Sequence, residues 1–406
     1  MAKADQLTPT NIVKLVLLNI VHWVSFLSIR DKNIWIFGSW DGKVFLDNSK
    51  YLFLASQKLS PAVKPIWISN NTALVHSLKT KGFKAYYTFQ IQAVLYGLRA
   101  KYYFIDHAPL YGGFFAPTNL WLSGGAKIIQ LWHGVPLKRL DSVGLGGNKH
   151  KSGIGSFLAV LAKANLFNLF MNYYFVASSR LFGRLMAESF AVSGKKVLLS
   201  GYPRNVFQKV PMLSNYSLQK RLNEKIRKLK AEGKKLLFYI PTFRDYGGNP
   251  ITHNAIDLAV FEKFLMDNQC VLIVKFHEAD VIKLGNVSKK NIIFLPNGFD
   301  IYEVLSLCDV LITDYSSIFF DFLPFNRPII FYPYDLETYQ TSARCFYFDY
   351  NEFVPGLITH DFNEMLKSVS SILQAGADAY EEKREKLYDF CFEYKTLMLK
   401  NILVDY

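Results

Sequence analysis

The strongest constraint on the fold is a series of short apolar runs that alternate with helical patterns, and this series occurs twice. The first series contains the strand-like runs 33–38, 64–69, 101–106, 127–131, 173–178 and 197–201. The second series contains the runs 236–241, 270–276, 291–296, 309–313 and 328–332. Such runs, separated by helices, are typical of buried parallel strands joined by right-handed crossovers. The sequence therefore predicts an α/β protein with two Rossmann-like domains that face each other across a cleft and divide near 201–217.

Length and charge agree with two domains and an anionic partner. A chain of 406 residues is too long for one ordinary core. Its 47 Lys and Arg against 33 Asp and Glu give a net charge of +14, which attracts nucleic acid, anionic lipid headgroups or phosphate-rich substrates. Because no zinc-finger, helix-turn-helix or RNA-recognition signature is present, we expect no nucleic-acid partner.

The absence of several motifs narrows the chemistry further. The four cysteines form no C-x-x-C pair, so they indicate neither a zinc site nor a redox dithiol, and we expect reduced thiols in a cytoplasmic protein. The chain has no G-x-x-x-x-G-K-[ST] and no G-x-G-x-x-G motif, which disfavours ATPase and dinucleotide-binding functions.

Residues 10–30 form the most apolar segment near the N-terminus. Their polar side chains recur at roughly helical spacing: Asn11, Lys14, His22, Ser25 and Ser28. No apolar stretch in the chain reaches the ~20 residues that a membrane-spanning helix needs. Two interpretations stay open: a helix that lies in a membrane interface, or a helix packed on its own domain.

Each predicted domain places a histidine just after an apolar strand. His133 follows the run 127–131, and Gly134 and Pro136 predict a turn that directs it toward the cleft. His277 follows the run 270–276, immediately after Lys275 and Phe276. Packing under Trp132 would explain His133 alone, but a matching histidine in each half favours a functional site. The HExxH zinc motif fails after His277, because Val281 stands where the second histidine would be.

Phosphate-binding candidates lie at other strand ends. Ser316 and Ser317 are N-cap types before an apolar helix, where free amides form an anion site or where the serines simply cap the helix. Arg204 and Arg244 follow proline-containing turns and are suited either to clamp phosphate or to form ordinary surface ion pairs. No carboxylate-rich cluster surrounds His133 or His277, so we expect no obligatory metal, although a diphosphate donor can carry Mg²⁺.

Six ordered stretches together resemble the CDP-glycerol glycerophosphotransferases, which build teichoic acids and related capsule polymers. These stretches are 36–53, 130–140, 201–205, 240–245, 309–339 and 346–356. The resemblance covers roughly residues 31–360. It implies a GT-B fold, a CDP-activated donor held by the C-terminal half, and a peripheral position on the cytoplasmic face of the membrane.

The resemblance also assigns roles to residues. It implies that His133 is the catalytic base and that His277 contacts the donor phosphate. It also implies donor or phosphate contacts at Arg204, Asn205, Asp314, Ser316 and Ser317. Arg244 and Lys275 are expected donor or phosphate contacts because of their positive charge. On the acceptor side we expect Asp47, Asn48 and Gly134.

The expected organisation has four parts: an amphipathic helix over 1–30, an acceptor domain over 31–201, a CDP-donor domain over 202–378, and a helix over 379–406 that can cross back to the first domain.

The expected reaction moves glycerol phosphate from CDP-glycerol to a hydroxyl of a lipid-linked acceptor at an anionic membrane surface, releasing CMP. The alternatives are a CDP-ribitol donor, a GT-B glycosyltransferase that uses a nucleotide sugar, and a non-catalytic basic binding module. The oligomeric state, and whether the enzyme adds one unit or many, stay open.

Overall fold

The computed structural model describes residues 17, 20–106, 118–140, 172–190, 192–207, 219–244, 246–276, 290–342, 345–399 and 403. The chain forms two compact units. The first unit comprises residues 1–133, 140–207 and 394–406, and the second comprises 134–139 and 208–393. His133 is therefore the last residue of the first unit before the chain enters the second.

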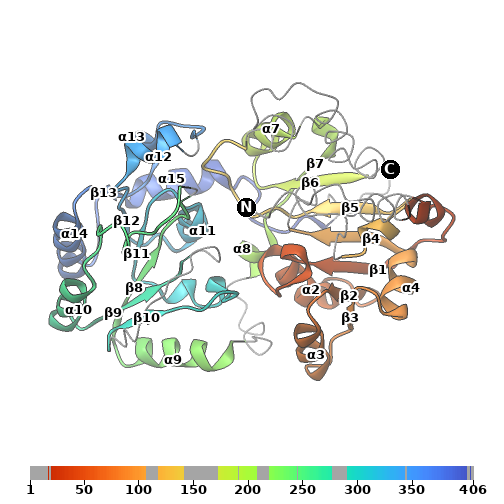
Figure 1. Cartoon of the computed structure of the whole chain (residues 1–406). Coiled ribbons are helices and arrows are strands. Elements are labelled where there is room, and N and C mark those ends of the chain that lie inside the picture. The colour runs from red at the N-terminus through yellow and green to blue at the C-terminus, as the bar shows by residue number, and fades with distance from the viewer. Residues whose placement is uncertain are drawn as a thin grey trace. The chain divides into compact units, whose positions relative to one another are not determined.

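The first unit is built on a seven-stranded parallel sheet with the order β3-β2-β1-β4-β5-β6-β7 (Figure 1). Its strands are β1 (Asp31–Gly38), β2 (Lys64–Ser69), β3 (Ala85–Tyr87), β4 (Ala100–Ile105), β5 (Lys127–Gln130), β6 (Tyr173–Ala177) and β7 (Val197–Leu199). Within the described ranges its helices include α2 (Asp47–Leu59), α3 (Thr72–Thr80), α4 (Ile91–Arg99), α7 (Arg180–Ser189) and α8 (Pro203–Phe207).

The second unit is built on a six-stranded parallel sheet with the order β10-β9-β8-β11-β12-β13. Its strands are β8 (Lys235–Ile240), β9 (Cys270–Val274), β10 (Ile292–Phe294), β11 (Val310–Thr313), β12 (Ile329–Phe331) and β13 (Leu357–Ile358). Its helices of four or more residues are α9 (Lys220–Ala231), α10 (Leu258–Asp267), α11 (Ile318–Phe322), α12 (Leu336–Ser342), α13 (Tyr350–Phe353), α14 (Phe362–Ala375) and α15 (Glu381–Cys391).

Strand β1 shows why the sequence contains continuous apolar runs instead of an alternating pattern. Ile34 and Ile36 pack with Ala93 of α4 in one core cluster. Phe37 points to the other face, where its ring lies 5.4 Å from that of Phe53 in α2. A parallel strand covered by helices on both faces buries every residue, so both alternating sets of side chains are apolar.

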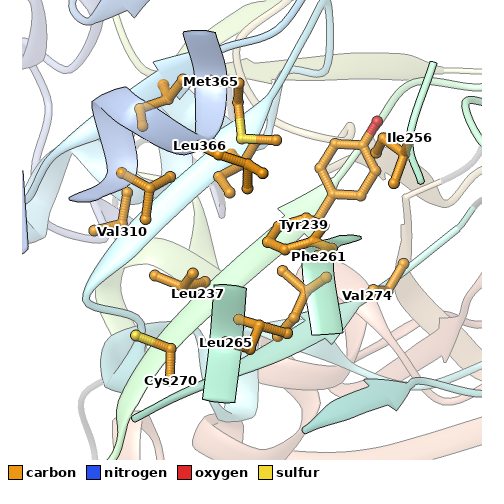
Figure 2. Packing of buried hydrophobic residues seen from close by; sticks show 14 of the residues in the cluster. Leu237, Tyr239, Ile256, Phe261, Leu265, Cys270, Val274, Val310, Met365 and Leu366 are labelled. Atoms are coloured by element: carbon orange, nitrogen blue, oxygen red, sulfur yellow. The ribbon is translucent and has the colours of Figure 1, made fainter. Parts of the chain in front are cut away.

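The core of the second unit forms in the same way around β8, β9 and β11 (Figure 2). Leu237 and Tyr239 of β8 pack against Phe261 and Leu265 of α10. At ~25 cal/mol per Å² of buried apolar surface, such a cluster supplies much of the driving force for folding and fixes the strand ends that carry polar residues.

The predicted α/β class with two Rossmann-like parallel sheets and the predicted strands are confirmed, with short omissions. Strands β3 and β13 were not predicted. They have three and two residues, and each contains half-buried side chains, so neither produces a long apolar run.

The C-terminal helix predicted over 379–406 is too long. Helix α15 ends at Cys391, within the second unit, and the chain joins the first unit only from Tyr394 onward. There the Tyr394 amide donates to the Ser178 carbonyl, and the Gly201 amide donates to the Thr396 carbonyl. These backbone hydrogen bonds tie the segment to residues of the first unit. The units also divide between residues 207 and 208, not between 201 and 202 as predicted.

Residues 20–25, inside the predicted N-terminal helix, are helical. Among the helices of the described ranges, none combines the length and the hydropathy that a membrane crossing requires. Residues 1–16, 18 and 19 lie outside the described residues.

Candidate active site

Both sheets have the same internal strand order. In both, successive strands are added on one side of the first strand, and the fourth strand is then added on its other side. The reversal lies between β1 and β4 in the first sheet and between β8 and β11 in the second. In open parallel sheets, ligands bind beyond the carboxyl ends of the strands at such a switch point. The polar residues that follow these four strands are therefore the first place to look for a site.

In the first unit, His133, Asp47 and Arg204 form a connected cluster. His133 Nδ1 lies 3.3 Å from Asp47 Oδ2, and the His133 side chain is 30% exposed. Arg204 Nη1 lies 2.6 Å from Asp47 Oδ1, and Arg204 Nη2 donates to the His133 carbonyl at 2.5 Å. Arg204 is buried, so it is not the surface ion pair that the sequence also allowed. One carboxylate thus joins a half-exposed imidazole to a buried guanidinium.

Asn48 holds the three segments of this cluster together. Its side-chain amide donates to the Leu131 and Trp132 carbonyls at 3.3 and 2.7 Å. Its side-chain oxygen accepts from the Arg204 backbone amide at 3.0 Å. The first turn of α2 is thereby tied both to the segment after β5 and to the start of α8.

The backbone around His133 is strained. Trp40, Asp47 and Trp132 have positive φ angles of 40°, 60° and 58°, a region that costs non-glycine residues energy and is concentrated at functional sites. The rings of Trp40 and Trp132 flank the His133 ring at 5.3 and 4.9 Å. Gly134 has φ 93°, so the predicted turn after the histidine requires a residue without a β-carbon.

The charge on Asp47 determines which ring nitrogen of neutral His133 carries the proton. Burial alone would raise the pKa of Asp47, but Arg204 and His133 lower it to about 2, so this carboxylate is ionised at neutral pH. An ionised carboxylate only accepts hydrogen bonds, so neutral His133 carries its proton on Nδ1 and its lone pair on Nε2. That tautomer is the one that a general base requires.

A second buried carboxyl, that of Asp106 beyond β4, was not predicted as a site residue. Burial and the neighbouring Asp47 raise its pKa well above the usual value, against the effect of the Ser49 backbone amide, which donates to Asp106 Oδ2 at 3.4 Å. The only sequence signal was a single acidic residue at the end of an apolar run, which the strand prediction absorbed.

In the second unit, Arg244 and Asp314 lie beyond the two central strands. Arg244 Nη1 lies 2.8 Å from Asp314 Oδ2, and the guanidinium also forms a two-point contact with Asp335 at 2.7 and 2.8 Å. Burial favours the neutral guanidine, but Asp314 and Asp335 raise the pKa of Arg244 above its usual value. Asp335 was not predicted from the sequence. Arg244 is fully buried, so it too is not a surface ion pair.

Ser316 and Ser317 follow directly after Asp314 and Tyr315. Ser317 precedes the first residue of α11, and its side chain makes no capping hydrogen bond. Both serines are half-buried. No hydrogen bond joins either hydroxyl to another group in the part of the chain that the structure describes, so the simple capping interpretation finds no support there.

The remaining predicted site residues are less enclosed or lie elsewhere. Lys275 follows β9, and its ammonium donates to the Phe276 carbonyl at 3.1 Å. Asn205 is half-buried in α8, next to Arg204. His277 lies outside the described residues, so its convergence with His133 stays a prediction. Within the described ranges, no group of three or more His, Cys, Asp or Glu side chains could hold a metal ion.

Two Rossmann-like parallel sheets with this strand order, and polar clusters at their switch points, are typical of α/β enzymes with a GT-B-like fold. The chain belongs to the CDP-glycerol:poly(glycerophosphate) glycerophosphotransferase family, whose model matches residues 18–397. It is therefore a transferase of the glycerophosphotransferase type, as the resemblance of its motifs implied.

Two curated relatives match over nearly their full length. The chain is 28% identical to a teichoic acid poly(glycerol phosphate) polymerase of Bacillus spizizenii, over 95% of this chain and 94% of the relative. It is 27% identical to a teichoic acid glycerol-phosphate transferase of Staphylococcus aureus, over 89% and 90% respectively.

A third curated relative is about twice as long as this chain, and a solved structure has a similar fold. The chain spans about half of a Staphylococcus epidermidis teichoic acid poly(glycerol phosphate) polymerase, at 28% identity over 90% of this chain and 49% of the relative. The solved structure of the wall teichoic acid polymerase TagF matches with a TM-score of 0.67 and 25% identity, over 94% of this chain and 92% of that one.

Proposed function

We propose that the protein transfers glycerol phosphate from CDP-glycerol to a hydroxyl of a lipid-linked acceptor in teichoic acid synthesis, releasing CMP. The observation that carries this proposal is the Asp47–His133–Arg204 cluster, found in a chain of this family at the carboxyl edge of a doubly wound sheet.

In the proposed reaction, His133 Nε2 removes the proton from the acceptor hydroxyl. The acceptor oxygen then forms a bond to the phosphorus that carries glycerol. The bond from that phosphorus to the bridging oxygen breaks, and CMP leaves with the electron pair. Asp47 keeps the imidazole in the required tautomer and stabilises the imidazolium that forms. General-base assistance of this kind contributes roughly 10²–10⁴-fold to the rate.

The donor side requires groups that bind and compensate a diphosphate. The hydroxyls of Ser316 and Ser317 and the ammonium of Lys275 are suited to this because they donate hydrogen bonds and, for Lys275, carry positive charge. We assign His277 and Asn205 to the same side by the resemblance alone. We also propose that no metal is obligatory, which loss of activity in EDTA and recovery with Mg²⁺ would contradict.

We further propose that the first unit binds the cytoplasmic face of the membrane as a peripheral protein. Around the helical residues 20–25, exposed apolar side chains accumulate, and Leu27 and Ile29 are 85% and 88% exposed. Arg30 donates to the carbonyls of Gly97 and Ser25 at 2.8 and 2.9 Å, which ties this segment to the end of α4. Helix α4 and the residues before it expose further apolar side chains: Phe89, Ile91 and Leu95. A surface of this kind suits an interfacial location.

Flotation with vesicles that contain anionic lipid tests this location. The double variant Trp23→Ser with Leu27→Ser should lose most vesicle binding. Met266→Ser, which removes an exposed apolar side chain from α10 in the second unit, should retain it. Equal binding by both variants would contradict an interfacial role for the N-terminal segment.

The activity is tested by incubating the protein with each candidate donor and a lipid-linked acceptor. We expect CMP release from CDP-glycerol and a product whose mass increases by glycerol phosphate units. CDP-ribitol is the necessary competitor, because the chain is also 26% identical to a Staphylococcus aureus teichoic acid ribitol-phosphate polymerase. Release of UDP from UDP-sugars would instead indicate a glycosyltransferase, and the product mass separates single from repeated addition.

A further inference from the structure

Arg244 is the most completely enclosed charged group in the described part of the second sheet's carboxyl edge. Its side chain has 0% exposure. Nε and Nη2 donate to the two oxygens of Asp335, and Nη1 contacts both the Thr242 carbonyl, at 2.6 Å, and Asp314. Three of these contacts are hydrogen bonds that the guanidinium donates, and the fourth, to Asp314, is an ion pair.

The faces of the guanidinium are also covered. Its central carbon lies 5.2, 5.1 and 5.4 Å from the ring centres of Tyr315, Tyr334 and Tyr339. Two carboxyl groups face its single positive charge, so the cluster has no surplus positive charge for a diphosphate. Because its side chain has 0% exposure among the described residues, Arg244 has no accessible surface with which to touch a donor.

The partners of Arg244 lead directly to the serine-containing turn. Asp314 Oδ1 accepts from the Thr242 backbone amide at 2.8 Å, and the Asp314 carbonyl accepts from the Tyr350 hydroxyl at 3.1 Å. The Tyr315 hydroxyl donates to Asp335 Oδ1 at 3.1 Å, and the Tyr315 ring stacks on Tyr339 at 4.1 Å. Asp314 is therefore fixed on both backbone and side chain, and Tyr315 is fixed through its side chain.

We propose that Arg244 is a positioning residue for the donor: with Asp335 it fixes Asp314 and Tyr315, and thereby places the hydroxyls of Ser316 and Ser317 where the diphosphate of the CDP-activated donor binds. This inference rests on the proposed function and changes the role of Arg244 from a direct phosphate contact to an indirect one. A rigid turn of this kind lowers the ordering cost of binding, because the hydroxyls are already in place.

Arg244→Lys tests the proposal, because lysine keeps the charge but cannot reproduce the two-point contact with Asp335. We expect the KM for CDP-glycerol to rise roughly tenfold, the loss of about one charge-assisted hydrogen bond, with a smaller change in kcat. Arg384→Lys is the matched control. Arg384 is also a buried arginine of the second unit, with Nη1 held by both oxygens of Asp378 at 2.7 and 2.8 Å. It should lose stability without raising the donor KM.

A double-mutant cycle with Ser316→Ala separates positioning from direct contact. If Arg244 acts through the turn, the double variant should bind CDP-glycerol, measured by calorimetry, about as weakly as Arg244→Lys alone. Losses that multiply would show that Arg244 and Ser316 act independently, and would overturn the proposal. An unchanged donor KM in a folded Arg244→Lys protein would overturn it as well.

Should Arg244→Lys fail to fold, Tyr315→Phe provides a milder test because it removes only the hydroxyl that donates to Asp335. We then expect a rise of a few-fold in donor KM at unchanged unfolding temperature, and no rise would count against the proposal. Wild-type turnover with CDP-glycerol is measured first. If the wild type uses CDP-ribitol instead, the proposed donor is wrong, while the positioning role is measured with the donor that is turned over.

Discussion

The two switch points of the molecule share a topology but treat charge in opposite ways. At the first, between β1 and β4, the cluster ends in an imidazole that is 30% exposed and held by an ionised carboxylate. At the second, between β8 and β11, the guanidinium of Arg244 is fully enclosed, and the half-buried groups nearby are the hydroxyls of Ser316 and Ser317.

This difference separates two tasks of group transfer. A base must exchange a proton with a substrate, so its reactive nitrogen needs access while its other nitrogen is held. A donor site must present fixed hydrogen-bond donors, so charged groups can be buried as supports and neutral hydroxyls left for the ligand. The carboxyl end of the first sheet, here called the first edge, is therefore suited to proton transfer. The carboxyl end of the second sheet, here called the second or binding edge, is suited to donor binding.

The largest expected effect is that of His133→Ala. Transfer should fall by roughly 10²–10⁴-fold because the proposed general base is lost, whereas binding of CDP-glycerol should stay within a few-fold of the wild type. Steady-state CMP release and calorimetry measure the two quantities. His360→Ala, a change at an exposed histidine of the second unit, serves as the control.

A variant at His133 that turns over like the wild type would remove the base assignment. A variant that loses donor binding in parallel with turnover would instead contradict the division of tasks between the two edges.

The second expected effect concerns Asp47 and acid. Its folded-state pKa of about 2 lies below the ordinary value of 3.8, so its ionised form stabilises the fold above about pH 4, and this contribution is lost as the pH falls through about 2. A difference of nearly two pKa units corresponds to roughly 2 kcal/mol. Asp47→Asn should lower the free energy of unfolding by at least that amount at pH 7, because Arg204 also loses its partner.

Urea unfolding between pH 2 and pH 7 measures this effect. The difference between wild type and Asp47→Asn should shrink toward pH 2, and Asp267→Asn, at an exposed carboxylate, should show no such convergence. A difference that is constant with pH would mean that Asp47 does not carry the linked proton.

The third expected effect is on the binding edge. Ser316→Ala and Ser317→Ala should each raise the KM for CDP-glycerol by about tenfold, the order of one hydrogen bond to a charged group, with little change in kcat. Ser370→Ala, in α14, is the control and should leave both values unchanged. If the serine variants instead lower kcat alone, these hydroxyls serve the transition state and the two edges share the chemistry.

The sequence indicated single candidate residues better than it indicated the partners that hold them. His133 could be found because a histidine, Gly134 and Pro136 end a buried strand, and that signal is local. Its partner Asp47 lies 86 residues away, and only the order of strands in the sheet brings the two together. Strand order depends on crossover packing that no local pattern encodes.

The second edge shows the same limit. Arg244 follows a proline-containing turn and was expected to face a phosphate or the solvent. It is enclosed because Asp335, 91 residues later, approaches from the end of β12 together with the tyrosine rings. Apolar runs predict which strands are buried, but they do not predict which polar side chains meet at the sheet edge.

The smallest expected effect sharpens the electrostatic part of the comparison, because Asp106 should behave in the opposite way to its neighbour Asp47. Its pKa in the folded protein is raised well above the ordinary 3.8. At a pH between the unfolded and the folded pKa, the folded protein therefore holds a proton that the unfolded chain releases. Stability from this group is therefore lost as the pH rises. Asparagine resembles the protonated acid, so the stability of Asp106→Asn relative to wild type should increase as the pH rises above the ordinary pKa of an aspartate, with no gain at acidic pH.

The same urea titration measures both variants, and their differences from wild type should follow pH in opposite directions. A loss of stability in Asp106→Asn at pH 8 would mean that this carboxyl is ionised in the folded protein. Two adjacent buried carboxylates, Asp47 and Asp106, would then share the positive charge of Arg204. His133 would lie beside two negative charges instead of one.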